Sequence, residues 1–237
     1  MIPLRDANPT RRTPYITLTL IGASIMAFAW ELGVLARAGE DGLHSLFLDH
    51  GVVPADLSAA LSGGQVVSGP TVAILTSLFL HGDWIHLAGN LLYLWIFGNN
   101  IEDRLGPLAF LGFYLLGGVA AALAQVAIDP ASRAPLIGAS GAIAATLGAY
   151  LVLYPRARIL SLVLLGFFYQ LIEIPALLVL GFWFVLQLFD GVASLGAPTA
   201  GGAIAFFAHI GGFVAGALVA LAVRAIGARS LRSASVG

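Results

Sequence analysis

Long apolar segments dominate this chain, and each is near the ~20 residues that a helix needs to cross the hydrocarbon core of a bilayer. The segments are Tyr15–Ala36, Trp84–Ile101, Pro107–Ile128, Leu136–Tyr154, Ile172–Leu188 and Gly202–Val223. Helices satisfy their own backbone groups in lipid, so the pattern predicts an all-α membrane protein with a bundle of six transmembrane helices. Residues 14–224 would form the membrane domain, and residues 1–13 and 225–237 would be cytoplasmic tails.

The composition agrees with a membrane protein and excludes several other classes. Hydrophobic residues make up 59% of the chain and charged residues 10%, whereas soluble domains contain roughly 25% charged residues. A net charge of −1 gives no reason to expect a nucleic-acid partner. The absence of cysteine excludes disulfides, thiol catalysis and thiolate metal sites. The histidines lack metal-ligand spacing, so we predict neither metal nor cofactor.

The basic residues indicate the orientation in the membrane, because cytoplasmic loops are enriched in Lys and Arg. All of them are arginine. With a cytoplasmic N-terminus, the inner segments contain Arg5, Arg11, Arg12, Arg104, Arg156, Arg158, Arg224, Arg229 and Arg232, and the outer ones only Arg37 and Arg133. This asymmetry predicts a multi-pass protein with both termini in the cytoplasm. We expect it in the plasma membrane of a bacterium or archaeon.

Three connecting segments also carry predictions. Residues 37–83 form the longest connection, and its apolar stretch Thr71–Leu80 is too short to span. We therefore expect this first loop to be partly embedded in the membrane. Ile159–Gln170 is predicted to lie at the inner interface and lead into the fifth span. Asp190–Gly201 is predicted to be an outer loop and a mobile cap.

Four polar residues fall at a similar depth in this topology. Ser140 lies about one turn below the outer surface in the fourth span, and His209 lies roughly 10 Å below the start of the sixth. His86 is in the first turn of the second span, and Asn90 follows four residues later on the same helical face. Ionisable residues at membrane depth are costly, which indicates a functional site. A serine beside a histidine base is the minimum requirement for nucleophilic catalysis.

Small residues offer a way to bring the serine and the histidine together. They recur at spacings of three and four residues in the fourth and sixth spans, at Gly141, Ala145 and Gly148 and at Ala208, Gly212 and Gly216. Faces of small residues let helix backbones approach closely in lipid. We therefore predict close packing of these two helices.

Three motifs resemble the signatures of rhomboid intramembrane serine proteases. They are His81–Asn90 with the sequence HGDWIHLAGN, Gly138–Gly141 with GASG, and Ala208–Gly212 with AHIGG. Their order and spacing match over roughly residues 70–220. Glu102–Gly106 also resembles a structural turn of that family.

The resemblance implies an endopeptidase with a Ser140–His209 dyad and no third acid. Ser140 would attack the scissile carbonyl, and His209 would take its proton and pass it to the leaving amine, as in triad enzymes. The oxyanion would be bound by the Ser140 backbone N–H and by the side chains of His86 and Asn90. The substrates would be single-span membrane proteins cut near the outer face.

The sequence departs from the family pattern at two places. The first loop contains Trp84 and Arg37 but no adjacent Trp-Arg pair. Ala144 stands where some members place an aromatic residue against the histidine, so no residue is evident that orients His209. Asp190 lies at a loop boundary, and we do not expect it to complete a triad.

Two other functions remain open. In a transporter or channel the four polar residues would line a polar path, although no inverted repeat is visible in the sequence. An inactive rhomboid-like protein would instead recognise membrane helices without cutting them. Such proteins lack the serine or the histidine, whereas this chain has both.

Overall fold

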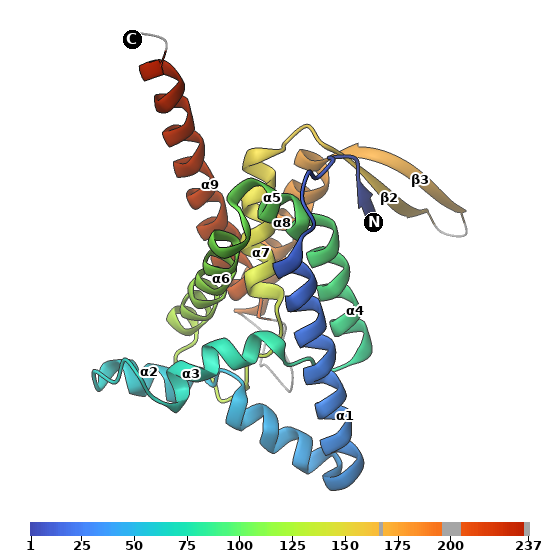
Figure 1. Cartoon of the computed structure of the whole chain (residues 1–237). Coiled ribbons are helices and arrows are strands. Elements are labelled where there is room, and N and C mark those ends of the chain that lie inside the picture. The colour runs from blue at the N-terminus through green and yellow to red at the C-terminus, as the bar shows by residue number, and fades with distance from the viewer. Residues whose placement is uncertain (166–167, 196–204, 235–237) are drawn as a thin grey trace.

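The apolar segments form helices arranged around a central one, as the computed structural model shows (Figure 1). It describes residues 1–165, 168–195 and 205–234, with side chains for 1–164, 168–195 and 205–226. Helices α1, α6, α8 and α9 are long and apolar enough to cross a membrane. Their bounds are Tyr15–His50, Pro107–Ile128, Ala176–Ser194 and Phe206–Ala234. The predicted fold class, a helical membrane bundle, is confirmed.

The other two predicted spans are less regular. Helix α4, Trp84–Tyr93, continues through the π-helical turn η2, Leu94–Gly98, into α5, Asn99–Leu105. Helix α7, Ser140–Leu153, has 14 residues. It is about 21 Å long at 1.5 Å per residue, which is less than the ~30 Å of a hydrocarbon core. The six-span count therefore stays a prediction.

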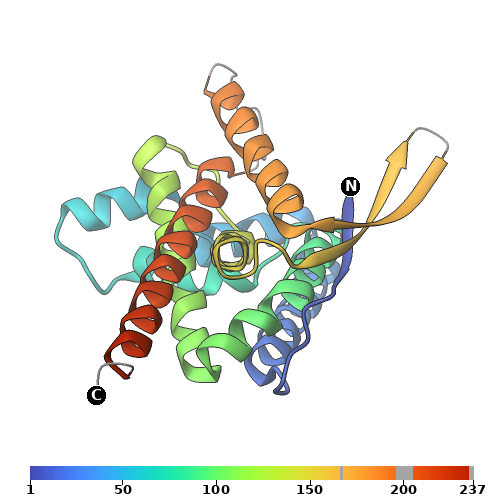
Figure 2. The same ribbon diagram turned by 90° about the horizontal axis from the view of Figure 1, so that it is seen from above.

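Helix α7 forms the centre of the bundle. In Figure 2 it is seen end-on, with the other helices around it. All residues from Gly141 to Tyr150 are buried. A Cβ at Gly212 or Gly216 of α9 would overlap the backbone carbonyl of Gly141 or Ala145. The predicted close packing of small residues between these two helices is thus confirmed, and it brings two backbones into direct contact.

The first loop folds into helices. After a break at Gly39, where φ is +67°, α1 continues to His50, and α2 follows at Pro54–Ser62. The stretch Thr71–Leu80 falls largely in α3, Gly69–Thr76, and the 3-10 turn η1, Ser77–Phe79. This segment is bent by 82° relative to α4 and α5. Such a bend is typical of a broken span or a re-entrant segment.

Two buried glutamates connect α1 to the segments on either side of α4 in the sequence. Glu102 accepts hydrogen bonds from the backbone N–H groups of Ile16 and Thr17, at 2.9 and 2.8 Å, and so pairs N–H groups that the first turn of a helix leaves free. Glu31 accepts one from the backbone N–H of His81, at 3.1 Å. His81 lies three residues before Trp84, so this bond ties the segment that precedes α4 to α1. The Asp83 side chain caps α4 itself by accepting from the N–H groups of Ile85 and His86.

The segment Ile159–Gln170 lies in a small antiparallel sheet, which shifts the predicted start of the fifth span. Strands β2, Arg158–Leu165, and β3, Phe168–Pro175, pair as a hairpin that projects sideways from the bundle (Figure 1). The fifth span therefore begins at Ala176 and not at Ile172. A short apolar run cannot be assigned to helix or strand by periodicity alone, and Pro175 separates the strand from the helix because it has no N–H to donate.

The N-terminal segment, predicted to be a tail, contains a strand. Strand β1, Ile2–Asp6, pairs with β2 and lies at the same end of the bundle as the C-terminal part of α9 (Figure 1). Asp6 Oδ2 accepts hydrogen bonds from Tyr150 Oη and Asn100 Nδ2, each at 2.7 Å. Burial raises the pKa of the Asp6 carboxyl, although both hydrogen bonds oppose this effect. These contacts hold β1 against the C-terminal end of α7.

Candidate active site

Ser140 is the first residue of α7, because the backbone before it cannot continue the helix. Gly138 has a φ of +112°, and its N–H donates to the Ser77 carbonyl at 2.9 Å. Leu136 pairs with Val52 in an isolated β-bridge. The predicted start of this span at Leu136, one turn before Ser140, is therefore wrong. Ser140 instead stands where N–H groups lack partners within their own helix.

His209 lies in the first turn of α9, which begins at Phe206. Residues 202–204, where the sixth span was predicted to start, lie outside the described residues. The imidazole Nε2 is 2.8 Å from Ser140 Oγ. Gln125 of α6 accepts a hydrogen bond from the backbone N–H of Ala208 at 3.2 Å, which fixes this end of α9. The two predicted reacting groups are thus within hydrogen-bonding distance.

The other imidazole nitrogen of His209 contacts a residue that the sequence analysis missed. His209 Nδ1 is 2.6 Å from Gln187 Oε1 on α8. Trp183, one turn earlier, lies beside the imidazole with 6.0 Å between the ring centroids. Gln187 and Trp183 of α8 are thus the residues beside the imidazole.

A signal for Gln187 was present in the sequence. It is the one amide or charged side chain between Ala176 and Phe189, in an otherwise apolar segment. Asp190 follows it on α8, which extends to Ser194. The predicted outer loop Asp190–Gly201 is therefore helical up to Ser194, and its residues 196–201 lie outside the described residues.

His86 and Asn90 of α4 converge on Gly138. A Cβ at Gly138 would lie 2.5 Å from His86 Nε2 and 3.7 Å from Asn90 Nδ2. His86 Nδ1 accepts a hydrogen bond from the Gly82 N–H at 3.4 Å, so in the neutral ring Nε2 carries the proton. Asn90 Nδ2 uses one of its two N–H groups on the His86 carbonyl at 3.0 Å. Each side chain therefore has an N–H to direct toward Gly138.

The arrangement has the parts needed for acyl transfer. A hydroxyl stands beside a basic nitrogen, and N–H donors from α4 lie next to the start of α7. The positive end of the α7 dipole adds to the attraction for a negative oxygen. Absence of a side chain at Gly138 leaves the donors accessible to a ligand oxygen.

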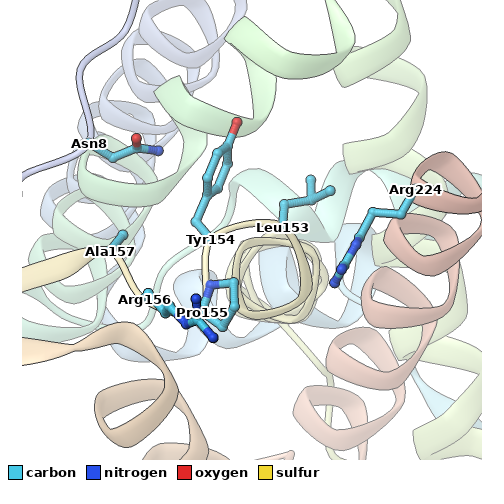
Figure 3. A pocket seen from close by; sticks show the side chains of 7 residues that line it. All are labelled: Asn8, Leu153, Tyr154, Pro155, Arg156, Ala157 and Arg224. Carbon is cyan, nitrogen blue, oxygen red and sulfur yellow. The ribbon is translucent and has the colours of Figure 1, made fainter. Parts of the chain in front are cut away.

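A cavity of about 530 Å³ lies at the opposite end of α7 (Figure 3). Among the side chains that line it are Leu153, which ends α7, and Arg156 and Arg224. Ser140 begins the same helix, so the cavity is separated from Ser140 by the helix length. It is therefore not part of the candidate active site.

Comparisons with known proteins agree with the motifs. The model of the rhomboid domain matches residues 68–226. Rhomboid protein 1, mitochondrial, of Saccharomyces cerevisiae is 29% identical over 151 residues, which cover 62% of this chain and 40% of that protein. Rhomboid protease GluP of Bacillus subtilis is 32% identical over 162 residues, which cover 68% of this chain and 29% of that protein.

A third relative is Presenilin-associated rhomboid-like protein A, mitochondrial, of Danio rerio. It is 36% identical over 94 residues, which cover 39% of this chain and 24% of that protein. The chain thus spans less than half the length of these relatives. The match to the domain nevertheless extends over most of this chain and includes all three motifs. The chain therefore belongs to the rhomboid family, as those motifs predicted.

Proposed function

We propose that this protein is an intramembrane serine endopeptidase with Ser140 as nucleophile and His209 as general base. The observation that carries the proposal is the 2.8 Å contact between His209 Nε2 and Ser140 Oγ. A nucleophile and a base within about 2.6–3.2 Å are the geometric signature of an activated serine. The name of the Bacillus subtilis relative, a rhomboid protease, supports the same assignment.

The reaction would follow two balanced steps. Ser140 Oγ attacks the scissile carbonyl carbon while its proton passes to His209 Nε2, and the tetrahedral intermediate collapses as that proton moves to the leaving amine. Water then attacks the resulting ester and gives its proton to His209. Transfer of this proton to Ser140 Oγ releases the new carboxyl end of the substrate and regenerates the hydroxyl.

The negative oxygen of the intermediate would be bound at Gly138. The donors are the Ser140 backbone N–H, His86 Nε2 and Asn90 Nδ2. Their position supports this role, because His86 and Asn90 both point to the space that a Cβ at Gly138 would occupy. Donors fixed before the reaction stabilise developing charge without reorganisation.

Alanine at His86 or at Asn90 is expected to lower kcat roughly 10²–10³-fold, with little change in KM, because each removes one oxyanion donor. Steady-state cleavage of a membrane-inserted substrate measures both constants. His44→Ala is the matched control, because His44 is an exposed histidine of α1. If kcat were unchanged in both site variants, these two side chains would not be oxyanion donors.

We also propose the substrate class and the orientation. Ser140 is at the end of α7 opposite to β1, and the arginine asymmetry supports a cytoplasmic position for β1. The site would then open toward the outer face and cut single-span membrane proteins near that boundary. The plasma membrane of a bacterium or archaeon is the proposed location.

Reconstitution in liposomes tests the function. Purified protein is mixed with a single-span reporter whose cut products are identified by mass. We expect cleavage near the outer end of the reporter helix by the wild type and none by Ser140→Ala. Reporter that binds without being cut would favour an inactive helix-binding protein. Solute flux through liposomes without proteolysis would favour a transporter or channel.

A further inference from the structure

We propose that Gln187 is a positioning residue that holds His209 in the tautomer required of a general base. This inference rests on the proposed function, in which His209 Nε2 must accept a proton. The observation behind it is the contact between Gln187 Oε1 and His209 Nδ1, at 2.6 Å. The amide thus occupies the place that a carboxylate has in a catalytic triad.

The chemistry of the amide fixes the proton on the ring. A carbonyl oxygen can only accept a hydrogen bond, so Nδ1 must donate to it. A neutral imidazole with its proton on Nδ1 has a lone pair on Nε2. That lone pair faces Ser140 Oγ at 2.8 Å, as a base must. Without an acceptor at Nδ1 the proton could reside on Nε2, and the ring could not activate the serine.

The packing of α8 on α9 determines where Gln187 points. Phe184, about one turn before it, stacks on Phe213 with 4.4 Å between ring centroids. Gly191, about one turn after it, lies so close to α9 that a Cβ would be 3.3 Å from Ile210 Cδ1. Residues spaced by three and four share one helical face. Gln187 is therefore directed toward α9 by contacts on both sides.

A neutral partner distinguishes this site from a triad. A carboxylate both orients the imidazole and stabilises the imidazolium that forms during catalysis, whereas an amide supplies only orientation and a dipole. The arrangement also explains how His209 is positioned although Ala144 lacks an aromatic ring. Trp183 limits the tilt of the imidazole from the side, and Gln187 fixes its rotation.

Three variants separate this role from a general effect on folding. Gln187→Leu removes the acceptor but keeps a side chain of similar size. Gln187→Glu keeps an acceptor oxygen on a side chain of the same length. Val185→Leu is the control, because Val185 is on the same helix with 58% of its surface exposed. We expect kcat to fall roughly 10²-fold for the leucine variant with little change in KM, because the ring loses its orientation. The glutamate variant should recover most of this loss, and Val185→Leu should match the wild type.

The tautomer can be read directly by ¹⁵N NMR of histidine-labelled protein at a pH where the ring is neutral. The His209 signals are identified among the five histidines by their absence in His209→Ala. We expect the Nδ1–H form in the wild type and a mixture or the Nε2–H form in Gln187→Leu. An Nε2–H form in the wild type, or the same tautomer and kcat in Gln187→Leu, would overturn the proposal.

This readout does not depend on proteolysis. If the wild type cleaves no reporter, the proposed function fails, yet the spectrum still decides whether Gln187 sets the tautomer. If cleavage occurs and the tautomer is independent of residue 187, the proposed function survives and the positioning role is rejected. The two proposals can thus fail separately.

Discussion

Alanine at Ser140, at His209 or at both is expected to lower reporter cleavage by about the same factor, roughly 10⁴-fold or more. The reason is that the two groups act as one unit, with Nε2 2.8 Å from Oγ. Once Ser140 is absent, His209 has no proton to accept. Once His209 is absent, the proton of Ser140 has no acceptor. The measurement is the single-turnover cleavage rate of a membrane-inserted reporter by the two single variants and the double variant.

Controls for this comparison use the same residue types elsewhere. Ser62→Ala and His50→Ala change a serine and a histidine in the first loop and should leave the rate unchanged. If the losses of the single variants instead multiplied in the double variant, Ser140 and His209 would act independently. That result would contradict a shared proton transfer.

Gly216→Ala is expected to destabilise the protein by about 3 kcal/mol or more, although it adds only one methyl group. The new Cβ would overlap the backbone carbonyl of Ala145. A side chain can change its rotamer to make room, but a backbone carbonyl cannot, so α7 and α9 must separate. Because Gly216 lies seven residues after His209 on α9, the separation should also move His209 away from Ser140.

The matched control is Gly112→Ala on α6, where an added Cβ would meet no atom within 4 Å. Alanine favours a helix over glycine by about 1 kcal/mol, so this variant should be as stable as the wild type or more so. Reversible unfolding in mixed micelles measures both variants. Equal stability of Gly216→Ala and the wild type would show that the close approach of α7 and α9 is not a constraint on the fold.

The long helices could be predicted from the sequence because the length and polarity of an apolar segment are local properties. Tyr15 and Pro107 begin α1 and α6 as predicted. The hairpin could not be predicted in the same way. Its strand β2 pairs with Ile2–Asp6, more than 150 residues earlier, and such pairing leaves no local signal. The apolar run that includes Ile159–Gln170 fits a helix or a strand equally well.

The boundaries next to the site depended on backbone conformation. Leu136 was predicted to begin the fourth span because it is apolar, yet the positive φ of Gly138 delays the helix until Ser140. Glycine is frequent in membrane helices, so its presence alone did not indicate this break. As a result, Ser140 is the first residue of α7, and the proposed mechanism depends on this position.

The four polar residues of the predicted site could be selected from their depth and from the family motifs, and the structure brings them together. Gln187 could not be added from depth alone. Its role depends on the rotation of α8 about its own axis relative to α9, which is set by contacts such as Phe184 on Phe213. A single polar residue in an apolar span is a signal, but it does not specify the partner.

The most direct test of the central claim is to locate the residue that reacts with a fluorophosphonate, a reagent that phosphonylates activated serines with loss of fluoride. Purified wild-type protein is labelled in liposomes, digested and mapped by mass spectrometry, with His209→Ala in parallel. We predict one adduct, on Ser140, that is lost or strongly reduced in His209→Ala. No adduct on Ser140, or equal labelling of Ser140 in the presence and absence of His209, would contradict the account.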